Sequence, residues 1–340
     1  MTDFSSALKK GTEISSGFFG KVFNAVDPVH GDVAVKVLHQ HIGEADDDWA
    51  LRKETLLNEA QSLSQADHPN VVRVHHLVKH ASDDTLHLVM ELCNGSLLDA
   101  FKTGPMQLSA VRRAATETAL GLDALHARGM IHRDIKPGNL LVSKNGVIKI
   151  GDFGLVTDDL ILGYGSSVGY IDHFAPEIFT GGGTSVKSDI WALGMTLYRL
   201  LHGRYWYSQL PDPREEIKKG GYASKLPWLP HIPDSWRRLI RRAMHDDKTQ
   251  RYQNALQFLD ALSNVVCEPE WRCELKPGKI IWTRSTETRN FLVEWTEHSS
   301  RKHEWSANSF PRKKGNKRAI GAAISSKEDC VRALNKFFAS

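Results

Sequence analysis

The 340-residue sequence contains few cysteines, no long apolar run and only a small net charge of +4. Its four cysteines form no C-x-x-C pair, which argues against a disulfide scaffold or a zinc ribbon and favours a reducing compartment. No apolar stretch approaches the roughly 20 residues that a membrane helix needs, and the first residues lack the basic flank and apolar core of a signal peptide. We therefore expect a cytoplasmic protein with no membrane partner.

The composition is that of an ordinary globular protein. Hydrophobic residues make up 41% and charged residues 25%, which excludes disorder, collagen and coiled coil for the chain as a whole. At about 150 residues per domain, the length predicts two domains, or three if one is a small lobe. Residues 267–340 hold 15 Lys and Arg against 9 Asp and Glu, whereas residues 1–266 hold 29 against 31. Such asymmetry predicts two units with different partners.

The N-terminal part of the chain predicts a β-rich segment that contains one helix. The pattern over 8–38 is strand-like, residues 49–65 carry apolar side chains at helical spacing, and 71–78 and 85–92 are further strand candidates. Beyond residue 97 the pattern turns helical, interrupted by a hairpin signal at Asn145-Gly146. The helices expected there cover 109–128, 188–202, 234–245 and 253–265.

A boundary is expected near residues 266–269, where Pro269 coincides with the change in charge. The strand candidates beyond it are 279–286, 290–296 and 318–324, and 313–318 forms a basic loop. Ser326 and Asp329 form a weak capping box for a final helix. Four of the nine tryptophans also lie here: Trp271, Trp282, Trp295 and Trp305. Three interpretations stay open: nucleic-acid binding, docking of an acidic protein partner, or a small α+β domain with a tryptophan core.

Two features near the N-terminus are suited to phosphate chemistry. The glycines of Ser15-Ser-Gly17-Phe-Phe-Gly20 allow a backbone to approach phosphate closely, although an ordinary hairpin turn explains them as well. The segment is not a P-loop, because the residue after Lys21 is Val22 rather than Ser or Thr. Lys36 lies inside an apolar run, where a lone lysine usually snorkels to the surface unless an acid meets it. Glu59 on the following predicted helix is such an acid.

Two further motifs bring oxygen donors together within twenty residues. His132-Arg-Asp134-Ile-Lys136-Pro-Gly-Asn139 follows a long predicted helix, and Asp152-Phe-Gly follows the predicted hairpin. Mg²⁺ prefers hard oxygen ligands, so an aspartate and an asparagine that also face substrate phosphates suit it. A lone Asp-Phe-Gly is by default a turn, but three such motifs in this order are not explained as turns.

From about residue 8 to 266 the chain resembles a eukaryotic-type (Hanks-type) serine/threonine protein kinase. The motifs above are followed in order by Ala175-Pro-Glu177, by the run that starts at Asp189, and by Arg251. The resemblance implies an α+β, bilobal fold with a β-rich N-lobe (8–92) that holds one main helix, and a mostly helical C-lobe (95–266). A small α+β domain of unknown role would follow at 267–340, where no family is recognised.

The same resemblance implies ATP and Mg²⁺ as cofactors and a protein as substrate. Lys36, held by Glu59, would bind the α- and β-phosphates, and Asn139 and Asp152 would bind Mg²⁺. Asp134 would accept the proton of the substrate hydroxyl, and Lys136 would stabilise the transferring phosphoryl group. The nucleotide would be contacted by Ser15, Gly17 and Gly20 over the phosphates, by Val22, Ala34 and Leu141 around adenine, and by Met90, Glu91 and Cys93 at the hinge. Glu177 and Arg251 would form a buried structural bridge.

Two departures from the family pattern bear on activity. Ser15 replaces the first glycine of the loop, which active members tolerate. Tyr170 stands where serine/threonine kinases usually have a threonine whose hydroxyl bonds Asp134 and Lys136, so the peptide-binding loop and substrate preference are affected. Arg133 beside the catalytic aspartate resembles kinases activated by phosphorylation of their activation segment. The hypothesis that follows is autophosphorylation at Ser166 or Ser167, with Thr157 and Tyr164 as secondary candidates. The alternative is an unmodified, flexible glycine-rich loop.

Two other functions are considered beside protein phosphorylation. A pseudokinase or scaffold would bind nucleotide without transfer, but Lys36, Glu59, Asp134, Asn139 and Asp152 are all present. A small-molecule phosphotransferase of related fold also uses an aspartate and an asparagine. Lys136, Glu177 and Arg251 favour the protein kinase.

Overall fold

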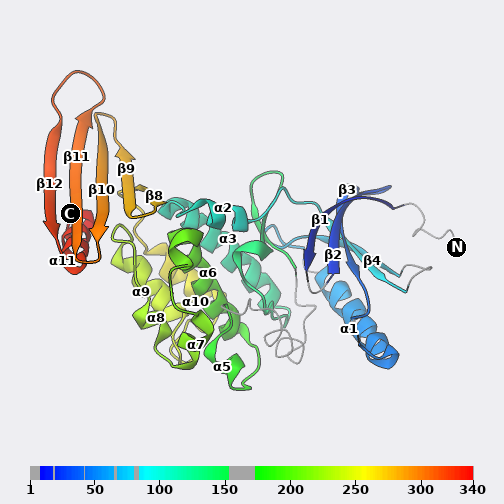
Figure 1. Cartoon of the computed structure of the whole chain (residues 1–340). Coiled ribbons are helices and arrows are strands. Elements are labelled where there is room, and N and C mark those ends of the chain that lie inside the picture. Colours follow the sequence, from blue (N-terminus) through cyan, green and yellow to red (C-terminus); the bar gives the residue numbers. More distant parts are fainter. Residues whose placement is uncertain are drawn as a thin grey trace.

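The structure is a computed structural model that describes residues 8–17, 20–41, 43–64, 67–79, 84–152 and 173–339. Its N-terminal part is an antiparallel five-stranded sheet in the order β1-β2-β3-β5-β4, with α1 (Asp46–Ser64) beside it (Figure 1). The strands are β1 (Lys9–Gly17), β2 (Gly20–Asp27), β3 (Gly31–Leu38), β4 (Val74–Lys79) and β5 (Leu86–Glu91). The predicted β-rich lobe with one helix is confirmed, although Val71 forms only an isolated bridge and the fourth strand begins at Val74.

The alternation of side chains on β3 separates the two faces of this sheet. Val33 and Val35 are buried in a small cluster with Ala25 and Val89 on one face. Ala34 belongs instead to the main core, which continues into the helical lobe. Because successive side chains of a strand point to opposite faces, Lys36 lies on the same face as Ala34. The alternation of β3 therefore places Lys36 on the face of the sheet that packs toward the helical lobe.

The second lobe is mostly helical, as predicted (Figure 1). Its long helix α3 (Leu108–His126) buries a stripe that includes Val111, Ala115, Ala119 and Leu122. The helix at 188–202 is longer than predicted, because a capping box formed by Ser185 and Ser188 starts it earlier and a kink at Gly203 joins a further turn. The elements of this lobe are α2 (Leu97–Thr103), α3, η2 (Pro137–Asn139), β6 (Leu140–Val142), β7 (Ile148–Ile150), α5 (Pro176–Phe179), α6 (Val186–Tyr207), α7 (Pro213–Lys218), α8 (Tyr222–Lys225), α9 (Asp234–Ala243) and α10 (Ala255–Ser263).

Main-chain hydrogen bonds fix the β6–β7 hairpin to the N-terminal lobe. The amide of Val72 donates to the carbonyl of Ile150 at 2.9 Å, and the amide of Ile150 donates to Asn70 at 2.8 Å. The side chain of Asn70 also donates to the carbonyl of Ile148 at 3.0 Å. The hairpin turns at Gly146, whose φ of 75° favours glycine, as the Asn-Gly pair predicted. Asp152, two residues beyond β7, is thereby positioned beside both lobes.

The C-terminal segment is an antiparallel meander of five strands followed by α11 (Lys327–Ala339). Its strands are β8 (Arg272–Lys276), β9 (Lys279–Ser285), β10 (Arg289–Ser299), β11 (Lys302–Pro311) and β12 (Arg318–Ser325). The sequence analysis missed β8 and β11. The predicted cap at Ser326 is confirmed, because its Oγ accepts from the amide of Asp329 at 3.2 Å.

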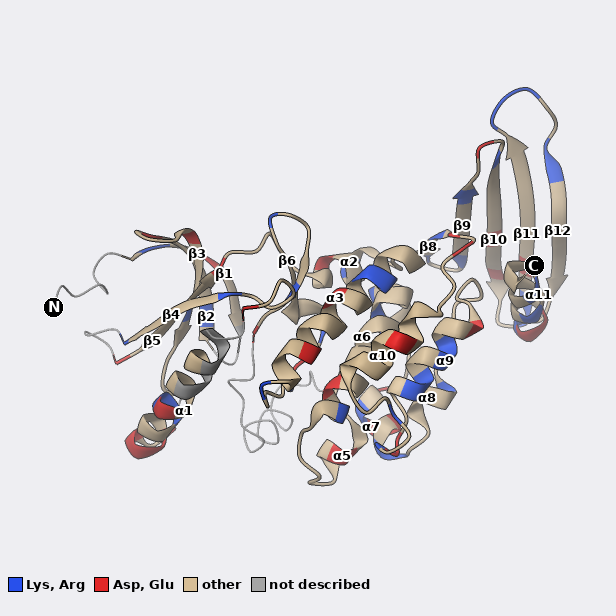
Figure 2. Ribbon diagram, turned by 180° about the vertical axis from the view of Figure 1, so that it is seen from behind, with Lys and Arg blue, Asp and Glu red and all other residues tan. Residues whose placement is uncertain are grey.

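The C-terminal sheet is attached to the helical lobe through buried side chains. Trp282 on β9 is fully buried and its indole nitrogen donates to Nδ1 of His231 at 3.0 Å. Arg237 on α9 donates to the side chain of Asn335 on α11 at 2.9 Å. Figure 2 shows β12 at the outer edge of the molecule and basic residues, in blue, in the loop that precedes it. Among the helices within the described ranges, none has the length and apolarity to cross a bilayer.

Candidate active site

The predicted glycine loop is the tip of the β1–β2 hairpin. Ser15 pairs with Val22 and Gly17 with Gly20, and the two residues at the tip lie outside the described ranges. Gly20 has φ of 130°, and a Cβ there would collide with the carbonyl of Val37 on β3. Glycine is therefore required at this position for steric reasons.

Three apolar residues predicted to surround adenine, and Met90 predicted at the hinge, come from both lobes. Ala34 on β3 pairs directly with Met90 on β5, and both are buried. Val22 on β2 and Leu141 on β6 are partly buried against the same core. Ala34 and Met90 are thus direct neighbours in the sheet, and the role of all four residues toward a nucleotide stays a prediction.

The predicted hinge lies between β5 and α2. Glu91 ends β5, and its carboxylate accepts from Nζ of Lys149 on β7 at 2.9 Å. Burial, with a smaller contribution from the charge of Glu91, raises the pKa of the half-buried Cys93 thiol to about 11. The amide of Asn94 donates to Val142 at 2.8 Å, which ties the segment to β6. The hinge is therefore held by the β6–β7 hairpin.

Lys36 is almost completely buried and forms an ion pair with Asp152. This contact joins β3 of the first lobe to the segment after β7 of the second. The Asp152 carboxylate is 40% exposed, so it keeps an accessible oxygen face while it binds the lysine. The predicted Lys36–Glu59 pair stays a prediction, because the Glu59 side chain lies outside the described part of α1.

The loop that carries Asp134 is held from below by Asp189 on α6, which is 1% exposed. The Asp189 carboxylate accepts from the amides of His132 and Arg133, each at 2.8 Å, and Nε2 of His126 lies 2.8 Å from it. Arg133 adopts φ of 72°, an unfavourable conformation for a residue with a side chain, and these bonds stabilise it. Asp189 therefore fixes the turn that presents Asp134.

His132 links this loop to the residue before Asp152. Its Nδ1 accepts from the amide of Asp134 at 3.2 Å, and its Nε2 lies 3.0 Å from the carbonyl of Gly151. Burial lowers the pKa of His132, which matches a neutral ring that accepts at one nitrogen and donates at the other. The two predicted motifs are thus joined by one buried imidazole.

The carboxylate of Asp134 is contacted at both oxygens. Oδ2 accepts from Nδ2 of Asn139 and from Nζ of Lys136, each at 2.8 Å. Nε2 of His173 lies 2.8 Å from Oδ1. Burial by itself raises the pKa of Asp134, but the contacts with His173 and Lys136 outweigh burial and lower that pKa below its usual range. The group is therefore a carboxylate at neutral pH.

Asn139 lies between Asp134 and the segment that leads to Asp152. Its Nδ2 donates both to the carbonyl and to Oδ2 of Asp134, each at 2.8 Å, so its Oδ1 is left as an acceptor. Its main-chain carbonyl accepts from the amide of Gly151 at 2.9 Å. Asn139 and Asp152 are thereby placed on neighbouring segments, each with an oxygen that a cation could take.

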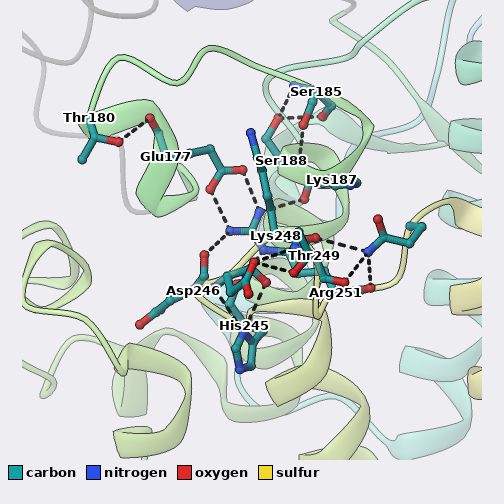
Figure 3. A network of polar contacts seen from close by, with 12 residues as sticks. Glu177, Thr180, Ser185, Lys187, Ser188, His245, Asp246, Lys248, Thr249 and Arg251 are labelled. Carbon is teal, nitrogen blue, oxygen red and sulfur yellow. Dashed lines mark hydrogen bonds and ion pairs between the residues drawn. The ribbon is translucent and has the colours of Figure 1, made fainter.

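The predicted Glu177–Arg251 bridge is confirmed (Figure 3). Nη1 and Nη2 of Arg251 each donate to one carboxylate oxygen of Glu177 at 2.7 Å. The remaining guanidinium hydrogens go to the carbonyls of His245, Lys187 and Asp246. Every donor of this buried cation is therefore satisfied, which fixes α5 to the C-terminal half of the lobe.

One residue of this site was not predicted from the sequence, and other residues that were predicted lie outside the described part of the chain. His173 was not singled out, and only its neighbourhood to Ala175-Pro-Glu177 could have drawn attention to it. Tyr170, Ser166 and Ser167 fall within 153–172, outside the described residues, so the predictions made for them stay predictions.

Comparison with known proteins gives the family of this bilobal chain. The family model "Protein kinase domain" matches residues 8–262, so the chain belongs to that family. Serine/threonine-protein kinase PrkC of Bacillus subtilis is 32% identical over 250 residues, which cover 71% of this chain and 38% of PrkC.

Two further relatives differ in organism and length. Serine/threonine-protein kinase PknA of Mycobacterium tuberculosis (strain H37Rv) is 31% identical over 264 residues, 74% of this chain and 59% of PknA. The cytokinesis protein sepH of Aspergillus terreus is 38% identical over 207 residues, 60% of this chain and 15% of sepH. The chain thus spans less than two thirds of each of these relatives.

Proposed function

We propose that this chain is a protein kinase that transfers the γ-phosphoryl group of ATP to serine or threonine hydroxyls of proteins. The observation that carries the proposal is the Asp134 carboxylate, which Lys136 and Asn139 hold at 2.8 Å beside the Lys36–Asp152 ion pair. The family membership and the names of PrkC and PknA support the same activity. The hydroxyl class is inferred from those names and from Lys136.

In this mechanism Asp134 acts on the substrate hydroxyl. The hydroxyl oxygen attacks the γ-phosphorus, the bond to the β-phosphate oxygen breaks, ADP leaves, and the hydroxyl proton passes to the Asp134 carboxylate. Lys136, which lies against Oδ2, neutralises charge on the transferring group, and Lys36 holds the α- and β-phosphates. Catalysis is then chiefly positioning and electrostatic stabilisation.

The donor set fits ATP with Mg²⁺. Asn139 keeps a free amide acceptor because its nitrogen is committed to Asp134, and Asp152 offers a partly exposed carboxylate. These hard oxygen donors would hold Mg²⁺, which when bound to the phosphates neutralises their charge. The hairpin of Ser15, Gly17 and Gly20 would cover the phosphates.

Phosphate transfer assays with two kinds of acceptor test the proposal. The chain is incubated with γ-labelled ATP and Mg²⁺ in the presence of a generic basic protein or of small alcohols, and labelled residues are identified after acid hydrolysis. We expect phosphoserine and phosphothreonine in the protein. Label in the small alcohols alone would favour a small-molecule phosphotransferase, and nucleotide binding without any transfer would favour a scaffold.

Two finer predictions accompany the proposed activity: autophosphorylation and a cytoplasmic location. Autophosphorylation at Ser166 or Ser167 is checked by mapping phosphopeptides from active protein, where an unmodified 155–174 segment would contradict it. A cytoplasmic location is supported by four cysteines that are all free thiols.

Of the binding modes predicted for the C-terminal segment, base stacking on tryptophan is not supported, and binding through the basic loop stays a prediction. All four of its tryptophans are buried, so they form core and do not offer rings for bases to stack on. The loop at 313–318 is exposed along its whole length and carries Lys313, Lys314, Lys317 and Arg318. Binding of an acidic protein or of nucleic-acid phosphates through this loop stays a prediction, which gel-shift and pull-down assays at two salt concentrations check.

A further inference from the structure

His173 is a buried imidazole directed at the carboxylate that the proposed reaction uses. It is 1% exposed, and its Nε2 lies 2.8 Å from Oδ1 of Asp134. The two residues lie 39 positions apart in the sequence, so this contact is made by the tertiary fold. Of the interactions that lower the pKa of Asp134, the one with His173 is the largest. A residue outside the predicted motifs therefore acts directly on the candidate base.

The position of His173 is set by a rigid neighbourhood. Phe174 and Ala175, which follow it, are buried, and the Phe174 ring packs edge-on against the imidazole with centroids 4.7 Å apart. Two residues further on, Glu177 is held by Arg251 through two hydrogen bonds of 2.7 Å. The buried Glu177–Arg251 bridge thus anchors the segment that carries His173 against the loop that carries Asp134.

The contact with His173 occupies one of the acceptor sites of the Asp134 carboxylate. A carboxylate offers two oxygens with about four lone-pair sites. Oδ2 already accepts from Asn139 and Lys136, whereas Oδ1 faces only His173 among the polar contacts in the described ranges. The remaining site for a substrate hydroxyl is therefore on Oδ1, beside the imidazole.

We infer that His173 is a positioning residue of this kinase: it donates to Oδ1, fixes the rotation of the Asp134 carboxylate and directs the second lone pair of Oδ1 toward the substrate hydroxyl. The inference rests on the proposed function. Without His173 the carboxylate is held at Oδ2 alone and can turn about its Cβ–Cγ bond. The ion contact of His173 is with Asp134 and not with a phosphate-binding residue, so we expect its loss to act on the transfer step.

The test compares His173→Leu, which removes the donor, with His173→Gln, whose amide nitrogen restores one at similar reach. We expect His173→Leu to lower kcat by roughly 10- to 100-fold with the KM for ATP unchanged, the pattern of a lost transition-state interaction. His173→Gln should recover kcat to within about threefold of the wild type. Each value is normalised to the folded fraction, measured by thermal unfolding.

A matched control separates positioning from folding. His202 is also fully buried, but its ring contacts the carbonyl of Tyr198 and the amide of Leu229 rather than the site. His202→Leu should lower the unfolding temperature and leave kcat per folded molecule unchanged.

Three outcomes are decisive. An active wild type with unchanged kcat in His173→Leu overturns the inference alone, and so does a loss of kcat that His202→Leu shares. A wild type that transfers no phosphate, at a rate equal to Asp134→Asn, overturns the proposed function and this inference with it.

Discussion

At the scale of single residues, two buried charged side chains, Arg251 and Asp189, are each held by several hydrogen bonds. Arg251 directs each of its five guanidinium hydrogens to an oxygen, two of them from Glu177. Asp189 accepts from two main-chain amides of the loop that carries Asp134. Such groups are costly to bury alone, and removal of one partner leaves the other uncompensated.

Arg251→Met tests the buried bridge. We expect it to lower the free energy of unfolding by roughly 3–5 kcal/mol, because the Glu177 carboxylate is then buried without its cation. Urea denaturation measures the change. The control is Arg332→Met, which breaks the exposed Arg332–Asp329 pair of 3.3 Å on α11 and should cost less than about 1 kcal/mol. Equal losses in the two variants would contradict the structural role of Arg251.

Cys93 reports on the predicted hinge. Because burial raises its pKa to about 11, the thiol is almost entirely protonated at pH 8, and alkylation by iodoacetamide should be slow and still accelerate above pH 9. A saturating non-hydrolysable ATP analogue should protect Cys93 while leaving Cys267, the other half-buried cysteine, unchanged. Peptide mass spectrometry follows both sites. Equal alkylation of Cys93 with and without nucleotide would argue against the hinge.

At the scale of elements, glycine positions decide how closely strands approach. Gly20 has a positive φ and its Cα faces the main chain of β3, whereas Gly31, at the β2–β3 turn, also has a positive φ but open space around it. Because only Gly20 is in close contact with β3, we expect the proposed nucleotide site to depend on Gly20 and not on Gly31.

Gly20→Ala should raise the KM for ATP by at least about fivefold, because strain of roughly 1–3 kcal/mol displaces the hairpin from β3. Gly31→Ala places alanine at φ of 70°, a smaller penalty, and causes no collision, so it should leave the KM for ATP near the wild-type value. Steady-state kinetics at saturating protein substrate measures both. A similar KM in the two variants would remove the steric argument.

Elements with local signals could be predicted from the sequence, and those fixed by distant contacts could not. The Asn-Gly hairpin, the stripe of α3 and the cap at Ser326 depend on residues a few positions apart. β11 was missed because its buried face includes His303 and Ser309, polar residues that hide the alternation.

In the candidate site too, features with local sequence signals were predicted and contacts between distant segments were not. The motif order predicted the neighbourhood of Asp134 and Asn139 and the Glu177–Arg251 bridge, but not the contact of His173 with Asp134 or the support from Asp189. These last contacts join segments far apart in sequence and depend on how α6 and the segment before α5 pack. No local pattern in the sequence encodes that packing.

At the scale of the whole molecule, the C-terminal segment shares its core with the helical lobe. Trp282 donates to Nδ1 of the buried His231, and Phe338 of α11 packs against both rings. The excess positive charge of the chain belongs to this segment, outside the residues that the family model matches. Its attachment is therefore structural, whatever its exposed basic loop binds.

Acid should weaken this attachment. Burial, with a contribution from Arg237, lowers the pKa of His231 from 6.5 to about 3, so the folded state holds the ring neutral. Because the folded-state pKa is the lower one, the stabilisation is present above pH 6.5 and is lost as the pH falls toward 3. The free energy of unfolding should fall by up to about 1.4 kcal/mol per pH unit from this group. His231→Gln keeps an acceptor but does not titrate, so its profile should be flatter, and parallel profiles would contradict this assignment.

In the proposed reaction, Asp134 accepts the proton of the protein hydroxyl during phosphoryl transfer. The most direct measurement is the initial rate of phosphate transfer from ATP to a generic basic protein by the wild type and by Asp134→Asn, with nucleotide binding checked in both. We predict that the variant binds nucleotide as the wild type does and transfers phosphate roughly 10²- to 10⁴-fold more slowly. Equal transfer rates in the two proteins would contradict the claim.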